Sequence, residues 1–485
     1  MIYMDQIMKN IADMKEYLET NDMGFGFLEL SKAIIDKDMC NMCGACISIC
    51  PRIGINTSKP KLNDYDPECS TCLKYCPRTY FPEELFKKAL FNGETKKDFY
   101  IGNYKNAFTA KSNDSSICNL SQDGGFVTTL LIYALEKGLI DGALLTDRDE
   151  EWRPKPFIAT TSEEIKRCAG SKYTISPTLK SYREAIETRK LKKIAFVGMP
   201  CQIKAVRKMQ LFSPFPSHYG TFELVIGLFC SSNFSYDLID DFIKTRLQIP
   251  PSHIKKMDIS RGKFILYLKD GKTIKTPIKE IVQYKWPSCD YCNDYSAEFA
   301  DISVGSIGAS EDNWNSAFIR TNKGQTLIKD ALDDNWIRKK NAIELSKITK
   351  ATIRKKSKKT RINEEHIKAL KAFGLSESAL EIYMILISTG GLTLPILQEM
   401  NGKQDKRKML GSLRVLKGQG WIYTDNGIYK PYNPEKVISK EITKLRQKLE
   451  NEIKQIKSKA LEYLVEKFLH NNYTDIKLDE LVDLI

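Results

Sequence analysis

Residues 40–51 read Cys-Asn-Met-Cys-Gly-Ala-Cys-Ile-Ser-Ile-Cys-Pro, so four cysteines follow the spacing C-x2-C-x2-C-x3-C and a proline follows the last of them. Thiolates at the first three positions reach three corners of one iron–sulfur cubane, and the cysteine before proline serves a neighbouring cluster. Zinc sites and secreted disulfide frameworks also use close cysteines, but a run ending in Cys-Pro is not typical of either. The stretch therefore predicts a small ferredoxin-like α+β domain, in which metal clusters take the place of a large hydrophobic core.

A second, shorter run ends in the same Cys-Pro pair and contains Cys69, Cys72 and Cys76. The cross-ligation pattern assigns one cluster to Cys40, Cys43, Cys46 and Cys76, and another to Cys50, Cys69 and Cys72. The missing fourth cysteine falls at Asp66, whose carboxylate is a harder iron ligand than a thiolate. The second site is therefore a cubane with an Asp66 or solvent ligand, a three-iron cluster, or absent.

Four further cysteines lie in the middle of the chain, at Cys201, Cys230, Cys289 and Cys292. Cys201 and Cys230 each come at the end of an apolar stretch that reads as a buried strand, where α/β sheets place their sites. The close pair Cys289-x2-Cys292 needs further ligands from elsewhere in the chain. Spacing alone leaves two interpretations open: a third cluster, or buried cysteines that act as small hydrophobic residues.

The composition agrees with a cluster-bearing protein of several domains. The 485 residues suffice for two to four domains, and the hydrophobic content of 42% is ordinary for globular cores. No apolar run approaches the roughly 18–20 residues that cross a bilayer, and the N-terminus is unlike a signal peptide. Because cluster cysteines must stay reduced, we expect a cytoplasmic, anaerobic protein. The net charge of +14 suggests an anionic partner, and none of the four histidines lies in a zinc-hydrolase pattern.

Changes of sequence pattern divide the chain into five regions. Residues 1–36 look helical, and residues 37–85 form the ferredoxin-like region. Residues 95–350 alternate short apolar strands with helices, which predicts an α/β core with a mainly parallel sheet. The expected strands are 142–146, 193–198 and 222–229, and the expected helices are 126–137, 181–189 and 202–209. Residues 354–361 are almost all basic and read as a linker.

The last two regions have a different character. Residues 362–433 contain three helical segments and a hairpin around Asp425-Asn426-Gly427, which predicts a winged helix. Ser378 and Glu381 have the spacing of a capping box for the first of these helices. Residues 434–485 begin with apolar residues at steps of three or four, which predicts a long helix that forms a coiled coil or docks on a partner.

Two polar loops of the core region have the composition of a nucleotide site. Gln122, Asp123, Gly124 and Gly125 directly precede a helix, where glycines let the backbone approach a ligand and the helix N-terminus favours phosphate. The second loop, 169–174, suits a pyrophosphate and a flat ring through Ser171, Lys172, Tyr173 and Thr174. Neither loop is a G-x-G-x-x-G fingerprint, so a helix-start turn and an ordinary polar loop are the alternatives.

Residues 100 to about 345 closely resemble the beta-subunit family of coenzyme F420-dependent hydrogenases and dehydrogenases. The matching stretches, in family order, are 122–125, 152–156, 169–174, 200–202, 207–210, 256–259, 289–292 and 300–306. The resemblance implies that the chain binds FAD and exchanges hydride with F420, a deazaflavin. It also implies that one [4Fe-4S] cluster is ligated by Cys201, Cys230, Cys289 and Cys292, which would bring the total to two or three clusters.

The same resemblance implies cofactor contacts at Pro200 and Gln202. F420 carries a phosphodiester and an oligoglutamyl tail, so a basic rim is expected, with Lys172, Lys204 and Arg207 as candidate anion partners. F420 takes hydride only, clusters pass single electrons, and a flavin does both. The expected function is electron transfer from clusters through FAD to F420, or the reverse. A partner oxidoreductase subunit or a ferredoxin would supply the electrons within a hetero-oligomeric complex.

The C-terminal part resembles the TrmB-type winged-helix regulators of archaea, through the phrase at 373–383, through 413–416 and through 420–422. Basic residues near the start of the third helical segment, at Lys403, Lys406, Arg407 and Lys408, could neutralise phosphates. Docking on a protein partner is the favoured interpretation of this region. Two alternatives for the whole chain are an iron–sulfur redox-responsive DNA-binding regulator and a flavin reductase with another hydride acceptor.

Overall fold

The computed structural model describes residues 26–56, 58–64, 71–79, 81, 83–91, 95–211, 221–357, 364–400 and 406–470. The chain divides into two compact units, one ending at Lys356 and the other beginning at Ser357. Among the described residues, no helix combines the length and the apolar character that crossing a membrane requires.

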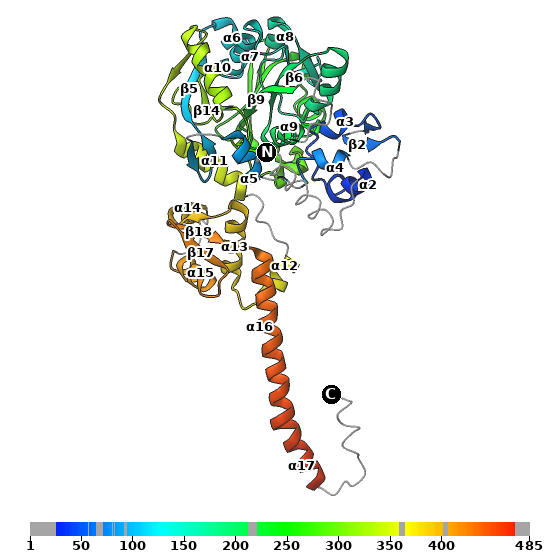
Figure 1. Ribbon diagram of the computed structural model, residues 1–485, viewed down its shortest axis with the longest axis vertical. Coiled ribbons are helices and arrows are strands. Elements are labelled where there is room, and N and C mark those ends of the chain that lie inside the picture. The colour runs from blue at the N-terminus through cyan, green and yellow to red at the C-terminus, as the bar shows by residue number, and fades with distance from the viewer. Residues whose placement is uncertain are drawn as a thin grey trace, which may run out of the picture. The chain divides into compact units, whose positions relative to one another are not determined.

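The first unit is built on an eight-stranded sheet with the order β15-β5-β14-β13-β9-β8-β6-β7 (Figure 1). Its strands are β5 (Asn106–Ser112), β6 (Gly142–Arg148), β7 (Pro154–Ala159), β8 (Lys193–Gly198), β9 (Thr221–Leu228), β13 (Ile302–Gly305), β14 (Asn315–Ile319) and β15 (Ile337–Lys340). The central strands β6, β8, β9 and β13 run parallel. Strand β7 at one edge and β14, β5 and β15 at the other pair antiparallel.

The prediction of a mainly parallel sheet is therefore wrong, because the sheet is mixed and parallel pairing is confined to its centre. The connections explain the difference. Only residues 149–153 join β6 to β7, and only 306–314 join β13 to β14. A parallel crossover needs a dozen or more residues, so these neighbours must pair antiparallel. The three strands expected from the sequence are confirmed as β6, β8 and β9.

Both faces of the sheet are buried, as alternating residues of its central strands show. Ala195 of β8 packs in one hydrophobic cluster with α7 (Phe126–Glu136) and α10 (Asn322–Asp333). Its neighbours Ile194 and Phe196 pack on the opposite face with α9 (Pro200–Leu211). Successive side chains of a strand point to opposite faces, so a strand covered on both sides reads as a continuous apolar run.

Shorter elements surround the sheet. The helices are α5 (Glu83–Leu90), α6 (Ser115–Leu120), α8 (Ser162–Arg167), η2 (Thr178–Ser181), η3 (Glu184–Thr188), η4 (Leu238–Arg246), η5 (Pro251–His253), η6 (Ile278–Glu280), η7 (Val282–Tyr284) and η8 (Pro287–Tyr291). Two small antiparallel sheets are made of β3 (Lys96–Asp98) with β4 (Gly102–Tyr104), and of β10 (Ile254–Ser260), β11 (Lys263–Leu268) and β12 (Thr273–Pro277). The helix expected at 181–189 is thus split between the short 3-10 segment η2 and the π segment η3.

The basic stretch expected as a linker begins inside a helix. Helix α11 spans Leu345–Ser357, and its last turn contains Arg354, Lys355 and Lys356. Lys355 is buried, and Lys356 pairs with the half-buried Glu298 at 3.7 Å. The linker prediction is wrong for residues 354–357, because they continue the helix and the side chains of Lys355 and Lys356 pack into the first unit. The remainder of the stretch, 358–361, lies outside the described residues.

The N-terminal segment packs directly on this core. It contains α2 (Phe27–Leu30), η1 (Ser31–Ile35), α3 (Ala45–Ile49), β1 (Ile53–Asn56), β2 (Lys59–Leu62) and α4 (Thr71–Tyr75). Gly44 has φ +90°, and a Cβ there would lie 2.6 Å from the Pro177 carbonyl oxygen and 2.6 Å from the Lys180 nitrogen. Leu179 donates its N–H to the Cys43 carbonyl at 3.0 Å. The first cysteine run is therefore held against the α/β core by a contact that only glycine permits.

The described residues of the second unit contain the three helices and the hairpin that the sequence predicts, together with an additional helix before them and the long helix after them. Its elements are α12 (Glu364–Lys371), α13 (Glu377–Thr389), β16 (Leu392–Thr393), α14 (Leu394–Met400), α15 (Lys406–Gly418), β17 (Ile422–Asp425), β18 (Ile428–Pro431), α16 (Pro434–Gln455), η10 (Ile456–Leu461) and α17 (Glu462–His470). The hairpin turn is as expected, with positive φ at Asn426 and Gly427. The capping box is wrong, because Ser376 is the N-cap and accepts from the Ala379 N–H, while Ser378 hydrogen-bonds to Ser412.

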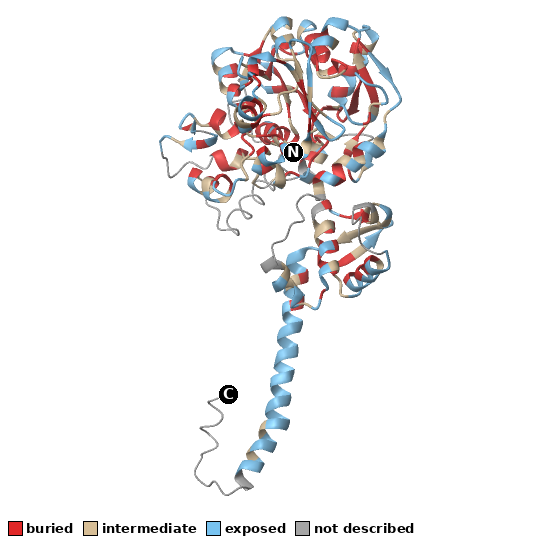
Figure 2. Ribbon diagram, turned by 180° about the vertical axis from the view of Figure 1, so that it is seen from behind, coloured by how far each residue is buried: buried red, intermediate tan, exposed pale blue. Residues whose placement is uncertain are grey.

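The long helix carries an apolar stripe that remains exposed (Figure 2). The side chains of this stripe, each 38–61% exposed, are Ile442, Leu445, Leu449, Ile453, Ile456, Leu464 and Phe468. The helix itself is confirmed over 434–470, while residues 471–485 lie outside the described part of the chain. A coiled coil or a docking role for this helix stays a prediction.

Replacing Gly44 with Ala should destabilise the first unit more than a comparable change elsewhere. Gly138 also has a positive φ, +65°, but nothing lies within 4 Å of its would-be Cβ. We expect Gly138→Ala to cost about 1–2 kcal/mol from backbone strain alone. Gly44→Ala should cost about 1–3 kcal/mol more, from overpacking against residues 177–180. Denaturant unfolding of both variants checks this, and equal losses would contradict the close contact.

Candidate iron–sulfur and cofactor site

The first cysteine run meets Cys76, as the cross-ligation pattern predicts. Burial raises the pKa of the Cys40 thiol to about 12, and the neighbouring Cys76 adds to this effect. Burial and Cys76 also raise the pKa of Cys43, and the pKa of Cys46 is raised by burial and then by Cys43, Cys40 and Cys76. These mutual effects show that the four thiols lie near one another in the interior, and their assignment to one cluster stays a prediction.

The second site of this segment is only partly described. Cys50 and Cys72 lie in the same small hydrophobic cluster as Cys40, Cys46 and Cys76, while Cys43 packs in a cluster of the α/β core. Cys69 and Asp66, however, lie outside the described residues. The composition of the second cluster, including a carboxylate ligand from Asp66, therefore stays a prediction.

The four scattered cysteines also come together. Cys201 lies in the first turn of α9, Cys230 follows β9, and Cys289 and Cys292 lie in and just after η8. Burial raises the pKa of Cys201 to about 11, with further contributions from Cys292 and Cys289. Burial likewise raises the pKa of Cys230 to about 12, and the other three cysteines contribute to the increase. Cysteine spacing alone does not predict this site, because its four cysteines come from three segments of the core that lie far apart in the sequence.

The donor set of this site suits a cluster better than a single ion. Among the described residues, no three Cys, His, Asp or Glu side chains approach one another closely enough to hold one metal ion. A cubane carries one thiolate on each of four irons, so its ligand sulfurs stand farther apart than the ligands of one ion. Four convergent cysteines, of which Cys292 is buried and the other three are half-buried, therefore fit a [4Fe-4S] cluster. The Asn233 N–H lies 3.2 Å from the Cys289 sulfur, as a hydrogen bond that would tune such a cluster.

The two cysteine sites adjoin each other. The indole Nε1 of Trp286 donates to the Cys40 carbonyl at 2.7 Å, and the Trp286 carbonyl accepts from the Cys289 N–H at 3.0 Å. Arg78 reaches from the ferredoxin-like segment to the Ser288 carbonyl at 2.7 Å. No motif in the sequence indicates these contacts. They fix the first cluster site to the turn that carries half of the other ligand set.

The two polar loops predicted to bind a nucleotide meet at a third segment. The Gln122 side chain donates to Asp258 at 2.9 Å and accepts from the Ser171 N–H at 3.3 Å. Lys256 donates to the Gln122 carbonyl at 2.6 Å, and the Tyr173 hydroxyl lies 3.4 Å from Asp258. Both loops are thus joined to strand β10. The sequence did not indicate that Lys256 or Asp258 contributes to a cofactor site.

The turn before α7 has features that fit a phosphate group. Gly125 has φ +72° and caps the helix, and a Cβ on Gly124 would lie 3.0 Å from the Asn315 side-chain oxygen. The Asp123 carboxylate accepts from Ser306 at 2.5 Å, and burial raises its pKa. The buried Ser121 hydroxyl has no hydrogen-bond partner within the described chain. A helix N-terminus beside a hydroxyl that has no partner within the described chain suits a phosphate.

The three basic residues predicted to bind an anionic cofactor already have hydrogen-bond or ion-pair partners within the chain. The Lys172 ammonium donates to the carbonyls of 168, 169 and 170 at 2.6–3.1 Å, which uses all three of its hydrogens. Burial lowers the pKa of Lys172 to about 8. Lys204 pairs with Glu83 at 3.0 Å, and Arg207 pairs with Asp301 at 3.0 Å in the core. Their assignment to an anionic cofactor stays a prediction that these contacts do not support.

The other residues predicted to contact the cofactor have structural roles within the chain. Pro200 is the first residue of α9, a position that suits its fixed φ. The buried Gln202 side chain donates to the Ser176 carbonyl at 2.9 Å and accepts from the Met199 N–H at 3.0 Å. Thr174 is also buried and forms an isolated parallel bridge with Phe234. These residues shape the backbone around Cys201 and the 171–174 loop.

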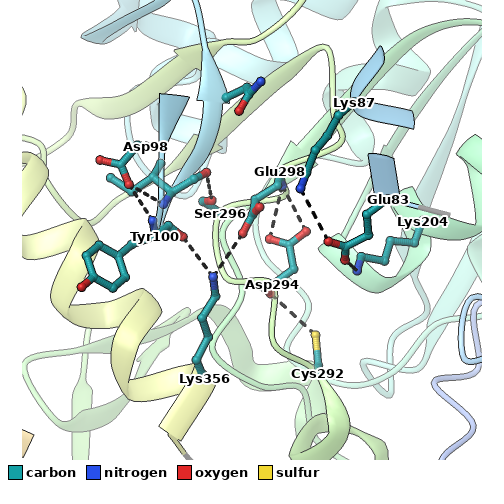
Figure 3. Close-up of polar contacts among 12 residues, drawn as sticks. Glu83, Lys87, Asp98, Tyr100, Lys204, Cys292, Asp294, Ser296, Glu298 and Lys356 are labelled. Carbon is teal, nitrogen blue, oxygen red and sulfur yellow. Dashed lines mark hydrogen bonds and ion pairs between the residues drawn. The ribbon is translucent and has the colours of Figure 1, made fainter. Parts of the chain in front are cut away.

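A network of charged groups borders the scattered-cysteine site (Figure 3). The Cys292 sulfur lies 3.6 Å from the Asp294 carbonyl, and the Asp294 carboxylate accepts from the Glu298 N–H at 3.1 Å. Burial and the nearby Asp294 raise the pKa of Glu298, while Lys356 opposes the increase. In the same view Lys204 points to Glu83. Acidic and basic side chains thus meet directly beside Cys292.

Replacing Cys289 with Ala should remove about four iron atoms per chain, because one corner of the cubane loses its thiolate. Cys168→Ala is the matched control, since Cys168 belongs to neither ligand set, and it should leave the iron content unchanged. Iron and acid-labile sulfide analysis of anaerobically purified protein measures both. Equal iron in the Cys289 variant and the parent chain would contradict the cluster at this site.

Comparison with known proteins agrees with this geometry. Two family models of the coenzyme F420 hydrogenase/dehydrogenase beta subunit match the core, the N-terminal model over residues 107–183 and the C-terminal model over residues 191–345. A 4Fe-4S binding domain model matches 33–52. These models end at residue 345, so the likeness of the C-terminal unit to TrmB-type regulators stays a prediction.

Individual relatives cover the same region. Coenzyme F420 hydrogenase subunit beta from Methanothermobacter thermautotrophicus is 37% identical over 282 residues, 57% of this chain and 98% of that protein. The same subunit from Methanococcus voltae is 37% identical over 280 residues, 57% of this chain and 98% of that protein. A chain in a xenon-derivatized structure of the F420-reducing [NiFe] hydrogenase complex from Methanosarcina barkeri is 35% identical with a TM-score of 0.53, covering 57% of this chain and 96% of that one. The chain belongs to the coenzyme F420 hydrogenase/dehydrogenase beta-subunit family of oxidoreductases.

Proposed function

We propose that this chain transfers electrons between iron–sulfur clusters and coenzyme F420 through a bound FAD. One continuous set of contacts carries the proposal. Tyr173, in a loop predicted to hold the cofactor, accepts the Phe234 N–H at 3.0 Å. The adjacent Asn233 N–H donates to the Cys289 sulfur. The candidate cofactor loop is thus linked through two residues to the proximal cluster, the name we give to the cluster of Cys201, Cys230, Cys289 and Cys292.

FAD, when bound, would supply the conversion between the single electrons of clusters and the hydride that F420 exchanges. The residues around the α7 N-terminus fit its pyrophosphate, because a helix N-terminus favours phosphate and the Ser121 hydroxyl has no hydrogen-bond partner within the described chain. The aromatic Tyr173 and the hydroxyls of Ser171 and Thr174 belong to the second loop.

The contacts between the two loops would hold such a cofactor in a fixed orientation. Gln122 and Asp258 tie the two loops together, so the cofactor would meet a preorganised surface. The Lys256 ammonium, on the Gln122 carbonyl, adds positive charge beside the loop. Hydride transfer needs aligned rings and excluded water more than a general base, which agrees with the scarcity of histidine.

The chain would act as one component of a larger complex. The relatives at 37% identity are beta subunits of hydrogenases, and the comparable solved chain comes from a hydrogenase complex. A partner protein or a free ferredoxin would deliver electrons at the clusters of residues 40–76. The exposed apolar stripe of α16 and α17 is the candidate surface for attachment to a partner.

A second candidate function, a redox-responsive DNA-binding regulator, is favoured by one observation. Lys406, Arg407 and Lys408 form the first turn of α15, next to the hairpin of β17 and β18. Helices of this kind enter the major groove in winged-helix proteins, and their cations contact phosphates. This interpretation requires specific DNA binding that weakens as salt rises, and it requires no turnover of F420.

Anaerobic turnover tests the proposed function. The full chain, loaded with clusters and FAD, should bleach the F420 absorbance in the presence of a reduced one-electron viologen. Omission of FAD or viologen should abolish the change. If clusters and FAD are both bound and F420 still does not react, the proposal is wrong. DNA titration at two salt concentrations would then test the regulator.

A further inference from the structure

Two lysine ammonium groups are buried in the first unit and have no acidic partner among the residues that the structure describes. Lys208 of α9 is inaccessible, and Lys355 of α11 is 3% exposed. Across the described residues, no carboxylate lies within the 4.0 Å of a salt bridge from either Nζ atom. Each ammonium instead donates to the main-chain carbonyl of a candidate ligand cysteine. Lys208 reaches Cys76 at 2.7 Å, and Lys355 reaches Cys230 at 2.5 Å.

Such an arrangement is costly unless something else supplies negative charge. A buried ammonium loses its hydration, and an isolated one would give up its proton instead. In the same unit the buried Arg207 pairs with Asp301, and the half-buried Lys204 pairs with Glu83. Lys208 adds only a hydrogen bond to the Thr79 hydroxyl at 2.9 Å, which carries no charge.

Each lysine faces a different set of cysteines. The groups that act electrostatically on Lys208 are Cys76 and Cys43, which belong to the first ligand set. Those that act on Lys355 are Cys292, Cys230 and Cys201, followed more weakly by Asp294. The two ammonium groups are thus distributed one to each candidate cluster.

A cubane with four thiolate ligands is an anion, and its reduction adds one more negative charge. A fixed positive charge close by stabilises the reduced form more than the oxidised form, and it does so strongly where water is excluded. The positive charge of each buried lysine would therefore be balanced by the negative charge of the cluster beside it.

We propose that Lys208 and Lys355 are positioning residues that each compensate one cluster and raise its reduction potential. Lys208 acts on the cluster of Cys40, Cys43, Cys46 and Cys76, and Lys355 acts on the proximal cluster. The step is the transfer of one electron from one cluster to its neighbour. No bond forms or breaks at either lysine. For Lys355 the inference rests on the proposed function, which places a cluster at Cys201, Cys230, Cys289 and Cys292.

The test is a redox titration followed by electron paramagnetic resonance on the full, anaerobically purified chain. Lys208→Met and Lys355→Met remove the charge but keep an apolar stem of similar length. Each should make reduction of its own cluster about tenfold less favourable, a shift of about 59 mV for one electron, and leave the other cluster unchanged. Lys208→Arg and Lys355→Arg should keep potentials near those of the parent chain. Lys347→Met, on the exposed side of α11, should change neither.

Iron and sulfide analysis of the parent chain separates the two ways to fail. If the parent chain has no cluster at the scattered cysteines, the proposed function and the Lys355 assignment fail together. If both clusters are present and neither Met variant shifts a potential, the inference is wrong and the proposed function stands. If a Met variant loses its cluster and the Arg variant keeps it, charge compensation is supported. Equal loss in the Met and Arg variants would overturn the inference.

Discussion

The hydrogen bond from the Trp286 indole to the Cys40 carbonyl is the contact on which the rest of this structure depends. It fastens the ferredoxin-like segment to the turn that carries Cys289, and Arg78 reinforces it from the other side. Without this attachment, the first cluster would sit on a small segment with little core of its own. With it, Cys43 and Cys201 come close enough to influence each other electrostatically. The N-terminal segment, which matches a 4Fe-4S binding domain, is therefore built into the oxidoreductase core.

Burial of charge is the second constraint. Clusters placed in the interior need compensating charge and hydrogen bonds, and those groups also determine how readily each cluster is reduced. The chain provides Lys208 and Lys355 from two different helices, along with main-chain N–H groups such as that of Asn233. The mixed sheet makes this placement possible, since α9 follows one central strand and the turn after β9 delivers Cys230 to the same place.

Local sequence pattern predicts the parts of this protein whose structure is decided locally. The cysteine run at 40–51, the strand at 193–198 and the Asn426-Gly427 hairpin turn follow from spacing and composition, and the structure contains all three. The antiparallel pairs β6–β7 and β13–β14 follow from connection length, and the basic stretch at 354–357 belongs to a helix whose Lys355 and Lys356 side chains pack on the core. Contacts between distant segments escaped prediction altogether. Nothing near Trp286, Lys208 or Lys355 in the sequence shows which carbonyl each will meet.

Spin coupling between the two clusters tests the central claim most directly, namely that the two cysteine sites adjoin. Dithionite-reduced protein would be examined by low-temperature electron paramagnetic resonance, with a Cys201→Ser variant that disrupts the proximal cluster as the reference. The account predicts a broadened, interacting spectrum in the parent chain and a simple spectrum from the remaining clusters in the variant. A parent spectrum that equals the sum of independent signals would contradict a direct electron route between these sites.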